Sequence, residues 1–184
     1  MLSQELTNLS GAFSQSFGTN VKAAVIGASG GIGTALVEAL SQLTSVSHIY
    51  AFSRTKSQLN NPKISAATVD IEKESTIAAA ADTIKMETDA LDILIVASGV
   101  LHQPGLMTPE RSLTELDSES LSTAFRINTV GPLLIAKHFY SLLPKTKKSV
   151  FAMLSARVGS IEDNHLGGWY SYRISKAGLN MGIK

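Results

Sequence analysis

Short apolar runs alternate with stretches of helical spacing along most of this chain, and that alternation limits the possible folds more than any other feature. The apolar runs, which we interpret as buried strands, cover residues 21–26, 46–52, 64–69, 91–97 and 149–154. The expected helices cover residues 31–43, 72–87, 117–127, 130–143 and 170–183. Strands that alternate with helices form a parallel sheet joined by right-handed crossovers. We therefore expect an α/β fold, a doubly wound parallel sheet with helices on both faces in three α/β/α layers.

A single domain is expected over residues 21–184, preceded by an extension of residues 1–20. The extension is polar, and we expect a short amphipathic or frayed segment without a chemical role. It lacks the basic and apolar stretches of a secretory signal, and no apolar run is long enough to cross a membrane. The formal net charge of +1 gives no reason to expect nucleic acid as a partner. The chain has no cysteine, which excludes disulfides and thiol chemistry, and we expect a cytoplasmic protein.

Each predicted strand is followed by a glycine or a polar residue. These residues are Gly27, Ser53, Asp70, Ser98 and Ser155. The carboxyl ends of parallel strands meet at one edge of the sheet, and ligands bind at that edge in folds of this kind. We therefore expect one ligand site along it.

The first strand leads into a glycine-rich turn, Gly-Ala-Ser-Gly-Gly-Ile-Gly over residues 27–33. A lone glycine pattern is weak, but this one lies between a predicted strand and a predicted helix, the setting of a dinucleotide-binding turn in a Rossmann-type fold. Glycines permit close backbone approach to a pyrophosphate, and the amides and dipole of the following helix favour the anion. The residues expected to bind the cofactor here are Gly27, Ser29, Gly30, Gly31, Ile32 and Gly33.

The end of the second strand indicates which dinucleotide binds. An acidic residue there would favour NAD by binding the ribose hydroxyl, but the chain has Ser53 and Arg54, with Lys56 nearby. Arginine suits phosphate through its forked donors, so we expect the 2′-phosphate of NADP, with NAD less favoured. A solvated surface arginine is the alternative.

Two further strand ends complete the expected cofactor site. Asp70, followed by Ile71, can accept a hydrogen bond from the adenine amino group, or alternatively can cap the next helix. Ser98 and Gly99 after the fourth strand are expected to let the backbone approach the cofactor closely.

Tyr172 and Lys176 lie four residues apart in the last predicted helix and so share one face. An ammonium beside a phenol stabilises the phenolate and lowers the pKa of the tyrosine. A tyrosine tuned in this way exchanges a proton with a carbonyl or alcohol oxygen. A helical tyrosine alone is more often a packing residue, but the lysine and the glycine turn favour chemistry.

From residue 21 to its end, the chain resembles the short-chain dehydrogenase/reductase family, in the branch that carries G-x-x-x-G-x-G and Y-x-x-x-K. Residues 155–161 and 167–180 are similar in particular to the C-factor and sniffer-like carbonyl reductases. The family fold is the Rossmann type already expected. Its members continue beyond the tyrosine helix, so we expect the C-terminal strands of the sheet, and the loop that covers the substrate, to be missing.

The resemblance assigns roles to individual residues. Tyr172 is implied to be the general acid/base, because Tyr170 has Ile174 rather than a lysine four residues on. Lys176 is implied to lower the pKa of the tyrosine and to hold the nicotinamide ribose, and both Tyr172 and Lys176 are expected to bind the cofactor. Asn128 matches the asparagine that supports a water-linked proton relay, whereas from the residues alone it is a helix-breaking cap.

The chain departs from the family pattern at two places. The family serine stands three residues before a glycine, where this chain has Ala156, and Ser155 stands one residue earlier. Neighbouring strand residues face opposite ways unless a bulge redirects them, so we name Ser155 as the substrate-orienting serine, with Ser160 as the alternative. At residues 96–99 the chain reads Val-Ala-Ser-Gly where the family often has Asn-Asn-Ala-Gly, so the asparagines that brace the central strands are absent.

The function predicted is an NADP-dependent oxidoreductase that transfers hydride between the nicotinamide and a small-molecule carbonyl or alcohol, with Tyr172 as general acid/base. The alternative is a non-catalytic NAD(P)-binding signalling or regulatory protein, which the C-factor resemblance and the displaced serine favour. Neither of these two hypotheses requires a metal ion. The family often forms homo-oligomers through the helices at 130–143 and from residue 170 onward, and we lean toward one here.

Overall fold

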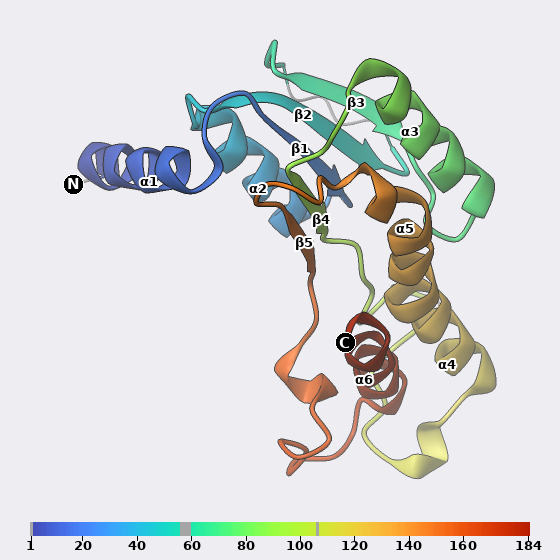
Figure 1. Cartoon of the computed structure of the whole chain (residues 1–184). Helices are drawn as coiled ribbons and strands as arrows, with labels where there is room; N and C mark the ends of the chain where they lie inside the picture. The colour runs from blue at the N-terminus through green and yellow to red at the C-terminus, as the bar shows by residue number, and fades with distance from the viewer. Residues whose placement is uncertain (1, 56–59, 106) are drawn as a thin grey trace.

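The computed structural model describes residues 2–55, 60–105 and 107–184, and within them the chain folds around one parallel sheet (Figure 1). Its strands are β1 (Val21–Ile26), β2 (Val46–Ser53), β3 (Ile64–Thr68), β4 (Ile93–Val96) and β5 (Val150–Met153). They lie in the order β3-β2-β1-β4-β5, so the direction of growth reverses between β1 and β4. This order confirms the predicted Rossmann-type sheet and puts the switch point at its centre, where such folds bind ligands.

Helices cover both faces of the sheet. They are α1 (Leu2–Phe17), α2 (Gly31–Gln42), α3 (Glu74–Glu87), α4 (Ser118–Phe125), α5 (Gly131–Phe139) and α6 (Tyr170–Ile183), with short 3-10 turns η1 (Leu113–Glu115), η3 (Tyr140–Leu142) and η4 (Arg157–Gly159) and a π-turn η2 (Arg126–Val130). Apolar side chains of α3 and α5 form one buried cluster with the sheet, and those of α2 form the other. Alternate residues of β1 enter the two clusters, which explains why this strand is apolar at every position except Lys22.

The N-terminal extension is a regular helix, so the amphipathic alternative describes it better than the frayed one. The rings of Phe13 and Phe17 stack with their centroids 4.9 Å apart and pack against the cluster that α2 forms with the sheet. Nζ of Lys148 lies 4.9 Å from the centre of the Phe17 ring. Burial of these two rings ties the end of α1 to the domain.

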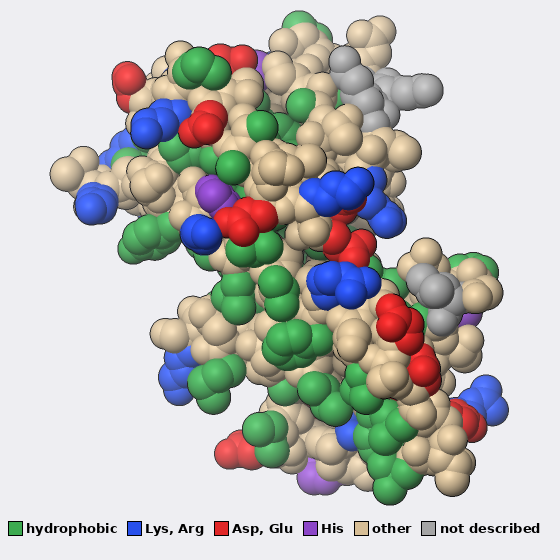
Figure 2. Space-filling view, turned by 90° about the vertical axis from the view of Figure 1, so that its right-hand side faces the viewer, with side chains coloured by type: hydrophobic (Ala, Val, Ile, Leu, Met, Phe, Trp, Pro, Cys, Tyr) green, Lys and Arg blue, Asp and Glu red, His purple; other side chains and the backbone are tan. Residues whose placement is uncertain are grey.

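The last helix, α6, packs against α4, η2 and η4 at the carboxyl edge of the sheet, below the strands in Figure 1. This lower part of the molecule also carries many exposed apolar side chains, seen as green patches in Figure 2. They include Phe125, Val130, Ile174, Met181 and Ile183. The packing of α6 against α4, η2 and η4 holds the face that carries Tyr172 and Lys176 beside the strand ends.

Candidate active site at the carboxyl edge of the sheet

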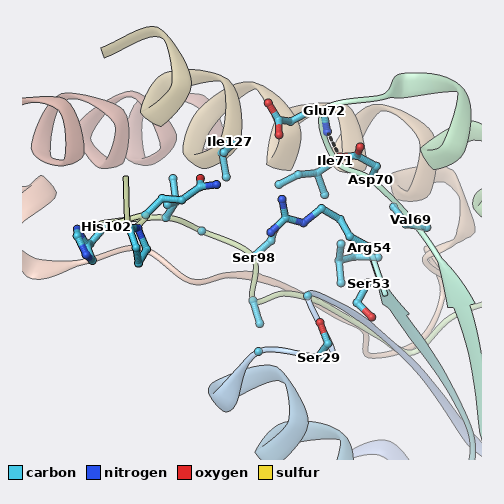
Figure 3. A pocket seen from close by; sticks show the side chains of 18 residues that line it. Ser29, Ser53, Arg54, Val69, Asp70, Ile71, Glu72, Ser98, His102 and Ile127 are labelled. Carbon is cyan, nitrogen blue, oxygen red and sulfur yellow. Dashed lines mark hydrogen bonds between the residues drawn. The ribbon is translucent and has the colours of Figure 1, made fainter. Parts of the chain in front are cut away.

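A cleft of about 390 Å³ opens where the strand ends meet, and most of the predicted cofactor residues line it (Figure 3). The predicted residues that line it are Gly27, Ser29, Gly30, Ser53, Arg54, Asp70, Ile71, Ser98 and Gly99. The other five do not line it: Gly31, Ile32 and Gly33 form the first turn of α2, and Tyr172 and Lys176 lie in α6. Lys56 lies outside the described residues. The loop after β4 adds His102, Gln103 and Pro104, which carry no motif and were not predicted.

The glycine turn is shaped by contacts that allow no side chain at two of its positions. Gly27 has a φ of +89°, and a Cβ there would lie 2.7 Å from the amide nitrogen of Ser98. A Cβ on Gly33 would lie 2.0 Å from the carbonyl oxygen of Gly27. These two glycines therefore let the turn fold against α2 and the end of β4. Gly31 has no atom within 4 Å of an added Cβ, so its outer side is open to a ligand.

The start of α2 suits an anionic group. The first amides of a helix have no partner within the helix, and they carry the positive end of its dipole. Gly30 precedes α2 as its N-cap and offers no side-chain cap, and both Gly30 and Gly31 are exposed. The hydroxyl of Thr34 donates to the carbonyl oxygen of Ala28 at 2.9 Å, which steadies the turn. A pyrophosphate fits this arrangement of open amides.

Arg54 and Ser53 differ in what they offer to a ligand. Ser53 is buried, and its hydroxyl donates to the carbonyl oxygen of Thr55 at 2.5 Å. Arg54 is exposed, and Figure 3 shows its side chain extending across the cleft from the end of β2. In the described part of the chain, no carboxylate forms an ion pair with Arg54. Arg54 is therefore the cation available to a phosphate here.

Asp70 serves the turn before α3 rather than capping that helix directly. One carboxylate oxygen accepts a hydrogen bond from the amide of Glu72 at 3.1 Å, and the other lies 3.5 Å from Nζ of Lys73. The helix begins at Glu74, with Lys73 at the N-cap, so it starts two residues later than predicted. The carboxylate still lines the cleft, where it retains acceptor capacity.

Asn128 does not break a helix, so the capping interpretation of this residue is wrong. It lies in η2, through which α4 continues into α5 without leaving helical angles. The side chain is completely buried; its oxygen accepts from the amide of Val100 at 2.7 Å, and Nδ2 donates to the carbonyl oxygen of Val100 at 2.8 Å. Nδ2 also donates to the hydroxyl of Ser175 at 3.0 Å. Asn128 thus braces the loop after β4, where the bracing asparagines of the family are absent.

Lys176 is buried and bonds to the end of β5. Its Nζ donates to the carbonyl oxygen of Leu154 at 2.7 Å and lies 5.8 Å from the centre of the Tyr172 ring. A Cβ on Gly99 would lie 3.3 Å from Nζ of Lys176 and 3.2 Å from Oδ1 of Asn128. Because Gly99 lines the cleft, these two side chains lie directly behind its wall.

The expected lowering of the Tyr172 pKa is not found in this structure. Burial raises the pKa of the Tyr172 phenol, and burial lowers the pKa of the Lys176 ammonium. Both shifts follow from the cost of charge in a partly dry site, and the ammonium bonds to Leu154 rather than to the phenol. Tyr172 is therefore protonated at neutral pH, as a proton donor must be.

The hydroxyl of Ser155 is bonded near the C-terminal end of α6, whereas Tyr172 lies in the first turn of that helix. The Ser155 hydroxyl donates to Oδ1 of Asn180 at 2.6 Å, and Nδ2 of Asn180 donates to the carbonyl oxygen of Gly159 at 3.3 Å. Asn180 lies eight residues after Tyr172, about 12 Å along a helix axis. The hydroxyl of Ser160, the alternative serine, accepts from the amide of Asp163 at 3.3 Å. Neither serine is shown beside the phenol.

Glu110 is a site residue that sequence reasoning missed. It lies in a loop, follows a proline and belongs to no motif, so no local signal identifies it. In the structure it is buried, with its carboxylate against the first turn of α6.

The described residues contain neither a cluster that could bind a metal ion nor a helix that could span a membrane. No group of three or more histidine, aspartate or glutamate side chains there could hold a metal ion. Nor is any helix in that part of the chain both long and apolar enough to cross a membrane.

Comparison with known proteins agrees with the fold and the motifs. A family model described as short chain dehydrogenase matches residues 21–184. The chain is 34% identical over 100 residues to C-signal of Myxococcus xanthus, which covers 53% of this chain and 55% of that protein. The solved carbonyl reductase Sniffer of D. melanogaster superposes with a TM-score of 0.76 at 24% identity, over 89% of this chain and 72% of that one. An NADPH-bound carbonyl reductase from chicken fatty liver gives a TM-score of 0.73 at 25% identity, over 89% and 68%. The chain spans about half to two thirds of the length of the curated relatives it matches.

Proposed function

The chain belongs to the short-chain dehydrogenase family, and we propose that it acts as an NADP-dependent oxidoreductase that reduces a small carbonyl compound or oxidises the matching alcohol. The observation that carries this proposal is the convergence of three features on one cleft. These are the open glycine turn, the exposed guanidinium of Arg54, which has no ion-pair partner among the described residues, and Lys176 with Asn128 behind Gly99. NADPH, when bound, supplies a hydride to a carbonyl carbon.

The phosphates of the cofactor would lie at the start of α2 and beside Arg54. The open side of Gly31 and the first amides of α2 suit the pyrophosphate, and Arg54 suits a 2′-phosphate. Asp70 and Ile71 line the same cleft and would border the adenine, with Ser98 and Gly99 nearer the nicotinamide half. A carbonyl reductase with a similar fold binds NADPH, which supports this choice over NAD.

Tyr172 would give its proton to the carbonyl oxygen during reduction and take it back during oxidation. Its phenol keeps that proton at neutral pH because burial raises its pKa. Lys176 donates one N–H to Leu154 and would hold the nicotinamide ribose with its remaining donors, and Asn128 would brace the wall beside it. For Ser155 to orient the substrate, as predicted, its hydroxyl must first leave Asn180.

The test is the consumption of NADPH by the 184-residue chain with a panel of aldehydes and ketones. Tyr172→Phe should lower the rate at least about 100-fold while NADPH still binds, because the proton donor is lost and the ring remains. Tyr170→Phe is the matched control, because Tyr170 lies two residues earlier, on a different face of the helix, and has no lysine four residues on. Equal rates for the two variants would remove Tyr172 from the proposal.

A second candidate function is a non-catalytic NADP-binding protein. Ala156 in the position of the family serine favours it, as does the identity shared with C-signal. This candidate predicts NADPH binding without consumption by any carbonyl in the panel. The same assay therefore separates the two candidates.

We also propose that the chain self-associates through residues 130–143 and α6, the two segments that the resemblance implies. Their exposed apolar residues, among them Val130, Ile174 and Met181, support this. Sedimentation of the purified chain would test it, since a monomer at all concentrations contradicts the proposal.

A further inference from the structure

The helix that carries Tyr172 is fixed at its start by a side chain from a distant loop. The carboxylate of Glu110 accepts hydrogen bonds from the amide of Ser171, at 3.3 and 3.4 Å for its two oxygens. It also accepts a hydrogen bond from the hydroxyl of Ser171. The main-chain oxygen of Glu110 accepts from the amide of Trp169 at 2.6 Å. One loop residue thus binds both residues that flank the first position of α6.

The chain reaches α6 through an unusual backbone path. Gly167, Gly168 and Trp169 all have positive φ angles, of +68°, +64° and +48°. Two glycines adopt this conformation readily, but a tryptophan does so only when its surroundings hold it there. The described surroundings that hold Trp169 are its hydrogen bond to Glu110 and the close approach of Gly168, whose added Cβ would lie 3.1 Å from the same oxygen.

Glu110 is buried, with 3% of its surface exposed. A buried carboxylate is stable only when its acceptor capacity is used, and here the amide and hydroxyl of Ser171 use it. The position at the start of a helix adds the attraction of the helix dipole. Removing the carboxylate would leave the amide of Ser171 buried and unpaired.

Tyr172 follows directly in this first turn. Its ring meets the Trp169 ring edge to face, with the centroids 6.5 Å apart. A shift of the first turn would therefore move the phenol, while Lys176 stays tied to the end of β5 by its bond to Leu154. We propose that Glu110 is a positioning residue that sets where the phenol of Tyr172 lies, acting through Ser171 and Trp169. This inference rests on the function proposed for Tyr172.

The test compares Glu110→Ala with Glu115→Ala, a matched control. Glu115 is an exposed carboxylate at the end of η1 that accepts from the amide of Arg111 at 2.7 Å and has no hydrogen bond or ion pair with α6 among the described residues. Trp169 is the only tryptophan in the chain, so its fluorescence reports on this turn alone. In Glu110→Ala we expect an altered emission maximum and faster acrylamide quenching, and a kcat at least about 10-fold lower, because a small misplacement of a reacting group is costly. The KM for NADPH should stay within about two-fold, since the cofactor cleft does not include Glu110. Glu115→Ala should match the wild type in all four of these measurements.

Conservative variants separate positioning from folding. Glu110→Gln keeps an acceptor oxygen at the same reach and should restore the Trp169 emission and most of kcat. If Glu110→Ala does not fold, Ser171→Ala must show the same pattern at smaller size, because it removes one of the donors that Glu110 accepts from. An unchanged Trp169 emission in Glu110→Ala overturns the proposal. A variant in which kcat and the affinity for NADPH fall together also overturns it.

The two failures are distinguishable. If the oxidoreductase proposal fails, wild-type protein shows no turnover, while the Trp169 emission still responds to Glu110→Ala. If only the positioning proposal fails, wild-type protein turns over and Glu110→Ala does so equally well.

Discussion

Nζ of Lys176 donates to the main-chain oxygen of Leu154 at 2.7 Å, which joins the tyrosine helix to the end of β5. The bond places the lysine behind the wall of the cleft and leaves it 5.8 Å from the centre of the Tyr172 ring. The ammonium is therefore bonded to the sheet edge rather than to the phenol. Because an ammonium has three N–H donors, Lys176 can keep this bond and still donate to the ribose of the cofactor.

The pKa shifts of this pair predict how the two directions of reaction depend on pH. Burial raises the pKa of Tyr172 above its ordinary value of about 10, so the proton-donating form persists across the neutral range. Reduction should therefore change little between about pH 6 and pH 8, whereas oxidation, which needs the phenolate, should rise about ten-fold per unit. Profiles of kcat/KM in both directions check this. A reduction rate that already falls steeply above about pH 6 contradicts it.

Two glycines of the same turn should respond differently to alanine. A Cβ on Gly33 meets the Gly27 oxygen at 2.0 Å, so Gly33→Ala should lower the free energy of unfolding by about 3 kcal/mol or more. Gly31→Ala meets nothing and should leave stability within about 1 kcal/mol. It should nevertheless weaken NADPH binding at least about 10-fold, because the methyl occupies the open side. Urea unfolding and NADPH titration of both variants measure these effects; undiminished affinity in Gly31→Ala argues against a pyrophosphate at this turn.

Arg54 should decide the choice between the two nicotinamide cofactors. Arg54→Ala is expected to weaken NADPH binding about 10- to 100-fold, the worth of a charge-assisted hydrogen bond, and to change NADH binding little. Arg157→Ala serves as control, since Arg157 is exposed and paired with Asp163 away from the cleft. Titration with each cofactor gives the ratio. An equal loss of affinity for NADPH and NADH would show that Arg54 does not bind the 2′-phosphate.

Substitutions at Ser155 and Ala156 test which of these two positions places a hydroxyl near the substrate. The hydroxyl of Ser155 already bonds to Asn180, so Ser155→Ala should lower kcat/KM by no more than about 10-fold. Ala156→Ser restores a hydroxyl in the family slot and should raise kcat/KM. Steady-state kinetics on both variants decide the matter. A loss in Ser155→Ala as large as that in Tyr172→Phe would show that Ser155 leaves Asn180 to orient the substrate.

The sheet could be predicted from the sequence because its signals are local. Each strand is an apolar run, and the glycine turn lies between β1 and α2, so the strand ends and the cleft they form followed from the order of elements. The strand order also agrees with the family resemblance.

Features that depend on contacts between distant segments were not predictable. From the sequence, Asn128 is interpreted as a helix breaker, because the sequence does not show that its side chain bonds to the backbone of Val100, 28 residues away in the chain. Glu110 carries no local signal because its partner Ser171 is 61 residues away. The opposite pKa shifts of Tyr172 and Lys176 depend on burial, which spacing along a helix does not reveal.

The activity proposed for this chain is hydride transfer from NADPH to a carbonyl carbon, with Tyr172 as the proton donor. The most direct measurement is a single turnover with NADPH deuterated at the transferred position, followed by mass spectrometry of the alcohol product. We expect one deuterium on the carbinol carbon with wild-type protein, and a rate at least about 100-fold lower with Tyr172→Phe. Bound NADPH that yields no labelled alcohol from any carbonyl tested would contradict it.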